Sequence, residues 1–473
     1  MSSKCCAFFL VFMVSNICYA FDKCQHSSSR AELSSVYQEA VLQNSELAAA
    51  RAEFKAQQEA VPQARANLLP AISSNATFES IRLERDSPQL TRVRSGMTYQ
   101  ANLKQTLFNA ELWFALKAAQ ASSAQSWIDL SVKEQDLVLR TAEVYFEVLR
   151  ASDDLAATNV EEISFKKQMD QAQAKLKGGL SSITDVLDAQ AAFDNVHANR
   201  KLAERKVYDG FEQLERLTNC DYSSIEGIEH QLPILPPAPR DAKLWVDAAV
   251  RQNLTLLASE RAVEVAAETF NQRRSAYVPT LEAVASYRKG DNDSFGYSNP
   301  TDFGTGGYQG NVAQSSIALQ VNLPIYTGGR MTSQARESYQ RLIQNEELNE
   351  TQRRDVVFNT RNYYRAVNSD IEQISARKKY ILSSQASLKA SKVGADIGTR
   401  NTVDVLNAQR RLFKAVRDYN NARYDYVLND LRLKKVAGSL GAEDLYSLAR
   451  YLKRDYEPRR DFLPSELGGA DFH

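Results

Sequence analysis

Two long stretches without glycine or proline constrain this chain more than any other feature of its sequence. The first runs from Ala110 to Lys177 and the second from Met331 to Val393. Glycine and proline interrupt helices most readily, so each stretch is predicted to form one unbroken helix. At the α-helical rise each helix would be roughly 100 Å long, far beyond what one globular core needs. The sequence therefore predicts coiled-coil or tunnel-wall helices.

The same short motif follows each of these stretches. Residues 179–190 read GLSSITDVLDAQ and residues 398–409 read GTRNTVDVLNAQ. In each copy a glycine ends one helix, and Ser, Thr or Asn caps the next. Each motif therefore predicts the tip of a helical hairpin, with return helices at about 182–218 and 402–437. Two such tips indicate a duplicated protein.

The segments before the long helices also match each other. A helix is predicted at about 29–67 and another at about 241–276, and each stops at a proline, Pro70 or Pro279. Proline cannot donate to the helical ladder, and it biases the residue before it to extended geometry. The matching stops strengthen the prediction of two repeated halves.

Two strands are predicted after each of these prolines, because apolar and polar residues alternate there. The predicted strands lie at about 70–80, 96–108, 280–288 and 314–326, and the polar segments 79–95 and 289–311 are predicted as loops. Such strands suit either a soluble hairpin packed on helices or a tilted crossing of an outer membrane. Four strands cannot close a barrel and lipid does not tolerate open edges, so a membrane location demands several chains in one barrel.

The N-terminus is predicted to be a secretory signal peptide. Lys4 precedes a short apolar run, and small residues stand before a cleavage point after Ala20. The mature chain would keep two cysteines, Cys24 and Cys220, which in an exported protein either pair or remain as two thiols.

These features divide the chain into consecutive parts. The predicted parts are a signal peptide at 1–20, a first repeat at 21–217, a proline-rich linker at 218–240, a second repeat at 241–437 and a C-terminal segment with a loose tail at 438–473.

Composition and motifs exclude several classes of function. The chain carries 58 Lys and Arg against 58 Asp and Glu residues, so nothing favours nucleic acid as a partner. Its four histidines are scattered, and no Ser/His/Asp, Cys/His or metal-ligand spacing emerges. We therefore predict neither an enzyme nor a cofactor or metal site.

With these motifs in the order helix, two strands, long helix, tip and return helix, repeated once, the chain resembles the TolC family of outer-membrane export channels. The most specific matches are the tip at 398–409, the following NARYDYVLNDLRLKKVAGSLGAEDL at 421–445, and the strand-to-helix junction NLPIYTGGR at 322–330. The resemblance covers nearly all of the mature chain.

The resemblance implies a mostly α protein with a small β part. Three chains would each give four strands to one twelve-stranded barrel in outer-membrane lipid, and their helices would form a hollow periplasmic α-helical barrel. Segments around the linker and the C-terminal part would wrap that cylinder at mid-height. Cys24 and Cys220 would both lie near this belt, which favours a disulfide between them.

The resemblance also places a gate at the periplasmic end, held by an acidic ring and a network of polar contacts. Asp404 matches the ring position, and Arg400, Asp185 and Gln168 match the latch. The other interpretation of the two aspartates is that they favour a helix start, and Arg400 could be an ordinary exposed tip residue.

Two positions depart from the family's gate. Asn407 stands where the family has a second acidic ring, and Ala395 stands where an aromatic latch partner is expected. Only one charged ring would therefore remain.

The function that the resemblance implies is a passive exit duct of a tripartite efflux or type I secretion system. It would lie in the Gram-negative outer membrane, extend into the periplasm, and open when a periplasmic adaptor and an inner-membrane pump, either ABC-type or proton-driven, dock. The competing hypothesis is a non-conducting coiled-coil protein of the envelope, which does not explain the four alternating strands.

Overall fold

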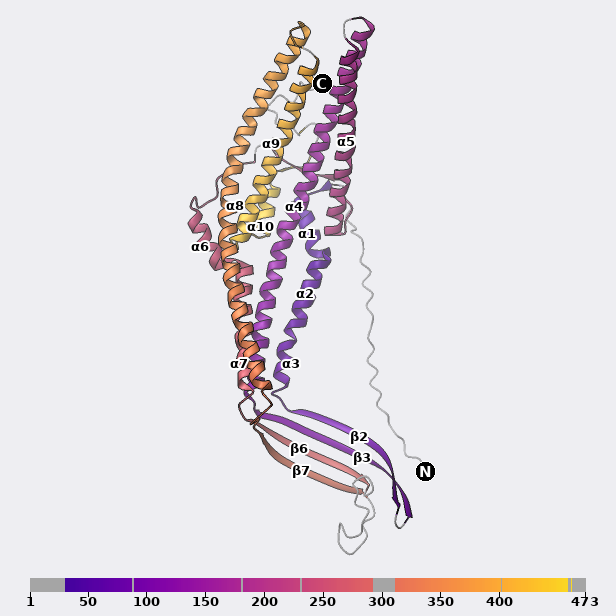
Figure 1. The fold of residues 1–473 in the computed structure, drawn as a ribbon, viewed down its shortest axis with the longest axis vertical. Helices are drawn as coiled ribbons and strands as arrows, with labels where there is room; N and C mark the ends of the chain where they lie inside the picture. The colour runs from indigo at the N-terminus through magenta and orange to yellow at the C-terminus, as the bar shows by residue number, and fades with distance from the viewer. Residues whose placement is uncertain are drawn as a thin grey trace. The chain divides into compact units, whose positions relative to one another are not determined.

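The computed structural model describes residues 30–86, 89–179, 182–229, 232–291, 311–400, 402–457 and 461. The predicted signal peptide and Cys24 lie outside these residues. The described chain is mostly helical and forms two compact units (Figure 1). Unit 1 comprises residues 30–44, 144–229, 451–457 and 461, and unit 2 comprises residues 45–143 and 232–450.

Unit 1 is built on a helical hairpin. Its helices are α1 (Leu33–Gln43), the C-terminal part of α4 (Ala110–Lys177) and α5 (Ile183–Thr218). Its short strands are β1 (Arg30–Ala31), β4 (Ser224–Ile225), β5 (Gly227–Ile228) and β8 (Leu452–Lys453). Strand β1 pairs with β4 in parallel, and β5 pairs with β8 in antiparallel orientation.

The buried phenol of Tyr145 ties α4 to these short strands. Its hydroxyl lies 2.7 Å from the carbonyl oxygen of Glu226 and 3.2 Å from that of Ala31, and it donates its hydrogen between them. Burial raises the pKa of this phenol well above its usual range. A buried donor that satisfies two backbone carbonyls fixes the strands in place.

Unit 2 contains the remaining helices and the only sheet of more than two strands in the described residues. Its helices are α2 (Ser45–Gln58), α3 (Ala60–Ala66), the N-terminal part of α4, α6 (Ala242–Gln252), α7 (Leu254–Ser275), α8 (Arg330–Asp396), α9 (Thr402–Val436) and α10 (Ala442–Ala449). Its strands are β2 (Ala71–Asp86), β3 (Gln89–Phe108), β6 (Thr280–Asp291) and β7 (Asn311–Asn322). Helices α8 and α9 run side by side (Figure 1).

The four strands form one antiparallel sheet with the order β2-β3-β6-β7 (Figure 1). The register places one row of apolar residues across all four strands, namely Ile72, Leu103, Ala285 and Ile317. The next row, on the opposite face, is entirely polar and consists of Ser73, Asn102, Ser286 and Ser316. Strands β2 and β7 are the two edges of this sheet, and each has one side without a strand partner among the described residues.

The helices that precede each pair of strands are not continuous, which corrects the prediction of single helices at 29–67 and 241–276. The chain breaks at Asn44 and again at Asn253, where the backbone is extended. The Asn253 side chain caps α7 by accepting a hydrogen bond from the Leu256 backbone N–H at 2.9 Å. An asparagine can end one helix and begin the next without glycine or proline, so the breaks carry no obvious sequence signal.

Both of these asparagines also bind the end of a return helix. The Asn44 side-chain amide donates to the Leu217 carbonyl at 3.3 Å, and the Asn253 amide donates to the Val436 carbonyl at 2.9 Å. The last carbonyls of a helix have no intrahelical partner. Each asparagine therefore satisfies such a carbonyl within its own unit.

Strand lengths differ from the predicted ones. Segment 79–95, predicted as a polar loop, is mostly strand, since β2 runs to Asp86 and β3 starts at Gln89. The alternation was hard to follow there because the apolar positions change parity between Phe78 and Ile81. Most of the other predicted loop, residues 292–310, lies outside the described residues.

The segment after Leu452 is also better ordered than predicted. Strand β8 pairs with β5, and the buried side chain of Tyr456 donates a hydrogen bond to Asp153. The ring of Tyr456 lies directly on Gly227, where an added Cβ would come within 2.2 Å of it. The C-terminal segment is therefore ordered at least as far as Tyr456, and a loose tail within residues 438–473 cannot begin before that residue.

Helix α10 is held to α9 by a partly buried ion-pair cluster. Lys434 Nζ lies 2.9 Å from Asp444 and 3.1 Å from Asp430. Burial alone would lower the pKa of Lys434, but the two carboxylates outweigh it and raise that pKa. The cluster fixes the C-terminal part of unit 2.

None of the helices in the described residues combines the length and the apolar character that a membrane crossing requires.

Candidate functional site at the helix hairpin ends

The α4–α5 hairpin end lies in unit 1 and contains Asp185. Helix α4 ends at two glycines, of which Gly179 has a positive φ of 73°. Helix α5 starts with a reciprocal cap: the Asp185 backbone N–H donates to Ser182 Oγ, and the Ser182 N–H donates to the Asp185 carboxylate, each at 3.2 Å. Asp185 therefore stabilises the start of α5 through a capping box. The sequence allowed two roles for this residue, a latch contact or a helix start, and the capping box corresponds to the helix start.

The α8–α9 hairpin end lies in unit 2 and is organised around a single backbone carbonyl. The carbonyl oxygen of Gly394 accepts from the Thr399 N–H at 2.8 Å, from the Arg400 N–H at 3.1 Å and from Thr399 Oγ1 at 3.1 Å. The turn passes through Gly398, whose φ is 76°. Carbonyls at the end of a helix need such donors, so these bonds fix the turn between α8 and α9.

Gly394 is a residue that the sequence interpretation missed. A Cβ built on it would lie 2.6 Å from Cγ of Arg400 and 3.2 Å from Thr399 Oγ1. The aliphatic part of the Arg400 side chain therefore packs directly against this glycine. A glycine two residues before the end of an otherwise glycine-free helix was the available signal.

Arg400 and Asp404 belong to the same hairpin end. Arg400 is exposed, whereas Asp404 is half-buried in the first turn of α9. Asn407, one turn further on, is exposed, and Ala395 is half-buried near the end of α8. A carboxylate in the first turn of a helix is favoured by the helix dipole.

The other two predicted latch residues, Asp185 and Gln168, lie in unit 1. Gln168 is half-buried on α4, ten residues before the α4–α5 turn begins. Their pairing with Arg400, like the acidic ring of Asp404, stays a prediction.

Cys220 lies just after α5, is buried and is disulfide-bonded. The other predicted partner, Cys24, lies outside the described residues, so the assignment of this bond to Cys24 stays a prediction.

The sheet is the second candidate element, because its two faces differ in chemistry. On the apolar face Ile317 is 88% exposed and Ile72 is 77% exposed. On the polar face the hydroxyls of Ser286 and Ser316 lie 2.7 Å apart, and Lys104 forms an ion pair with Glu282 at 2.9 Å. Exposed apolar side chains of this size on one face of a sheet require a nonaqueous neighbour.

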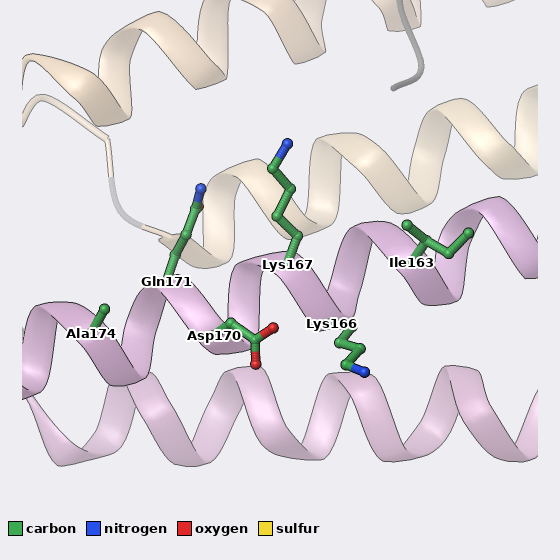
Figure 2. A pocket seen from close by; sticks show the side chains of 6 residues that line it. All are labelled: Ile163, Lys166, Lys167, Asp170, Gln171 and Ala174. Atoms are coloured by element: carbon green, nitrogen blue, oxygen red, sulfur yellow. The ribbon is translucent and has the colours of Figure 1, made fainter.

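The described residues also form two surface pockets. One, of about 440 Å³, lies along α4 and is shown in Figure 2, where Lys167 and Gln171 extend to the side of the helix opposite Lys166. The other, of about 310 Å³, lies in unit 2 between α4, α7, α8 and α9, and the Glu143–Arg432 ion pair (2.9 Å) lines it. In the part of the chain that the structure describes, no three His, Cys, Asp or Glu residues gather to hold a metal ion.

Comparisons with known proteins agree with this architecture. The family described as outer membrane efflux protein matches residues 36–219 and 245–439. Outer membrane protein TolC of Vibrio cholerae is 32% identical over 421 residues, covering 89% of this chain and 94% of that protein. Alkaline protease secretion protein AprF of Pseudomonas aeruginosa is 24% identical and covers 76% of this chain and 73% of that protein.

A solved structure with the same fold is the outer membrane protein VceC of Vibrio cholerae. Its TM-score is 0.71 at 16% identity, with 86% of this chain and 96% of that chain covered. This chain therefore shares its fold with VceC. The chain belongs to the outer membrane efflux protein family, whose members are transporters and not enzymes. It is an outer-membrane duct for efflux or type I secretion.

Proposed function

We propose that three copies of this chain close their sheets into one twelve-stranded barrel in the outer membrane. The observation that carries this proposal is the sheet itself, with an apolar face, a polar face and two edge strands, β2 and β7. Unpaired backbone groups at a sheet edge cost several kcal/mol each in lipid. Pairing β7 of one copy with β2 of the next would remove every edge, turn the apolar face to lipid and turn the polar face to a passage.

The duplicated order of helices and strands supports the second part of the proposal. The paired helices of three copies surround a periplasmic passage that continues the barrel, so the duct is passive and takes its energy from its partners. A non-conducting coiled-coil protein would have no use for a sheet with one apolar and one polar face.

Neighbouring residues of one strand provide a matched test of this arrangement. Ile317→Lys places a charge on the proposed lipid face at the middle of β7, whereas Ser316→Lys places it on the proposed passage face. A lysine facing lipid at mid-membrane costs about 2–4 kcal/mol. We expect Ile317→Lys to lower the yield of folded trimer in outer membranes and Ser316→Lys to be tolerated. Equal tolerance of both variants would contradict the proposed orientation of the sheet.

The gate of the passage is proposed to lie at the α8–α9 hairpin end. Three copies of Asp404 form the acidic ring, and Arg400, Asp185 and Gln168 contribute to the latch that holds the helices closed. The compact turn around Gly394 supports this role, because it fixes Arg400 and Asp404 on one rigid element.

Conductance in planar bilayers tests the gate and the duct together. Asp404→Ala is expected to weaken block by divalent cations and to shift the reversal potential away from cations. Arg400→Gln is expected to raise the resting conductance, because one latch contact is lost. A purified trimer that never conducts would overturn the duct. If the trimer conducts but Asp404→Ala leaves the cation block and reversal potential unchanged and Arg400→Gln leaves the resting conductance unchanged, the gate lies elsewhere.

The partners are proposed to be a periplasmic adaptor and an inner-membrane pump, ABC-type or proton-driven. The cargo is proposed to be either small molecules or a secreted protein. The family's description names efflux, which supports small molecules, and AprF is described as a protein for alkaline protease secretion, which supports a secreted protein.

A further inference from the structure

One narrow stripe of side chains on α9 is exposed to solvent near the α8–α9 hairpin end. Among residues 403–420 the exposed positions are Asn407, Arg411 and Lys414. The residues between them, such as Leu412 and Phe413, are almost completely buried. Spacings of four and three residues place the exposed positions on a single face of the helix.

Asp404 belongs to the same face of α9. It lies three residues before Asn407 and seven before Arg411, which is one turn and two turns of the helix. Any arrangement that turns Asp404 toward the passage therefore also turns Arg411 and Lys414 toward it. This step rests on the proposed function, in which Asp404 forms the ring.

Neither of the two cations is neutralised within the described part of the chain. Arg411 and Lys414 form no ion pair there, whereas Arg377 on α8 is neutralised by Asp418 on α9 at 3.1 Å. Two exposed and unpaired cations on one helix face produce a strong local positive potential.

We propose that Arg411 and Lys414 form two basic rings behind the acidic ring of Asp404, and that they make this duct selective for anionic solutes. Three copies would place six positive charges there, against three negative charges at Asp404. Rings of Arg and Lys are the usual basis of selectivity in pores for anions and phosphates. Arg411 lies about 10 Å along the helix from Asp404, which is comparable to the Debye length of ~8 Å at physiological salt. The acidic ring therefore does not cancel the basic ones.

The other hairpin lacks this feature, although its sequence is related. The residues that stand seven and ten positions after Asp185 on α5 are Ala192 and Asn195. Neither side chain is charged, so the first hairpin brings no corresponding rings. Of the two return helices, only α9 carries positive charges at these two positions.

The test compares single-channel recordings of the full-length trimer in planar bilayers under a KCl gradient. The double variant Arg411→Gln with Lys414→Gln is expected to move the reversal potential toward cation selectivity. Block by inositol hexakisphosphate, used as a polyanionic probe, should weaken by about tenfold or more. Lys243→Gln removes one exposed lysine at the start of α6 and serves as a control for the loss of a positive charge elsewhere in the chain, with no change expected.

Two further variants separate charge from folding. Arg411→Lys with Lys414→Arg keeps both charges and should keep the anion preference. Arg411→Cys should lose part of it and regain it after reaction with a positively charged thiol reagent.

The outcomes distinguish this inference from the proposed duct. A conducting double variant with unchanged reversal potential and unchanged polyanion block would overturn the basic rings. If Asp404→Ala still shifted the reversal potential, the duct and its acidic ring would stand. A wild-type trimer that does not conduct would overturn both.

Discussion

The α4–α5 and α8–α9 hairpin ends share a six-residue motif, DVLDAQ in the first and DVLNAQ in the second. The contacts that fix the two turns nevertheless differ. The first uses side chains, since Ser182 and Asp185 cap α5 reciprocally. The second uses a backbone carbonyl, that of Gly394, which gathers three donors from Thr399 and Arg400. In the first hairpin the motif's aspartate forms a reciprocal cap with Ser182, and in the second the Gly394 carbonyl fixes the turn between the helices.

The two hairpin ends also differ in charge. Residues 377–417 contain ten Lys and Arg against two Asp and Glu, whereas the matching residues 158–198 contain four against six. Related sequences have thus diverged in surface charge while keeping the motif at the turn. This difference in charge agrees with the proposal that the gate lies at the α8–α9 end.

The largest expected effect concerns the opposite ends of the return helices, where the two hairpins again differ. Helix α5 ends at Asn219 with a φ of 56°, and α9 ends near Gly438 with a φ of 77°. A Cβ on Gly438 would lie 2.1 Å from the backbone oxygen of Gln252. Gly438→Asn should therefore destabilise the protein by about 2 kcal/mol or more, measured by urea denaturation followed by far-UV circular dichroism.

The control is the reverse exchange at the end of α5. Asn219→Gly keeps a left-handed residue and should change the free energy of unfolding by less than about 1 kcal/mol. If both exchanges had the same effect, backbone conformation alone would govern the two ends, and the close approach to Gln252 would be irrelevant.

A smaller effect is expected from the cap of the first hairpin. Ser182→Ala removes the acceptor of the Asp185 N–H and should cost about 1 kcal/mol of stability. Because the second hairpin is held by the Gly394 carbonyl, Thr399→Val should cost less, since the two backbone donors remain. Thermal denaturation of both variants measures this difference. A larger loss of stability for Thr399→Val than for Ser182→Ala would contradict the account, because side chains would then matter more at the second turn than at the first.

Substitution of Gly394 is expected to have the smallest effect on stability. It should nevertheless change the resting conductance measurably. Gly394→Ala forces the flexible side chain of Arg400 to move, at a cost of less than about 1 kcal/mol. The resting conductance should nevertheless rise toward that of Arg400→Gln if Arg400 is a latch residue. An unchanged resting conductance in both variants would remove Arg400 from the gate.

Much of the helical framework could be predicted from the sequence, and the reasons are local. The stretches without glycine or proline correspond to α4 and α8, and the prolines at 70 and 279 precede the strands. The breaks at Asn44 and Asn253 could not be predicted, because an asparagine cap inside a helical pattern resembles an ordinary polar residue. The pairing of β8 with β5 depends on contacts between residues more than 200 positions apart, which periodicity does not report.

The candidate site was predictable only in part. The motif and the resemblance identified Arg400, Asp404, Asp185 and Gln168, but the reciprocal cap between Asp185 and Ser182 became visible only in the structure. Gly394 had a sequence signal, but its contact with the Arg400 side chain was visible only in the structure. The basic stripe required the exposure pattern along α9, since five of the ten basic residues in 377–417 lie on α8 and Arg410 and Arg417 of α9 are only half-exposed.

The most direct measurement asks whether the three copies of residue 404 meet around the passage. Asp404→Cys would place three thiols in one ring, and thiolates bind Cd²⁺ as soft ligands. In planar-bilayer recordings we expect Cd²⁺ to block Asp404→Cys channels, with recovery on chelation, at concentrations far below those that block wild-type or Asp185→Cys channels through the carboxylates of Asp404. Asp404→Cys channels that conduct and remain insensitive to Cd²⁺ would contradict a gate at the α8–α9 hairpin end.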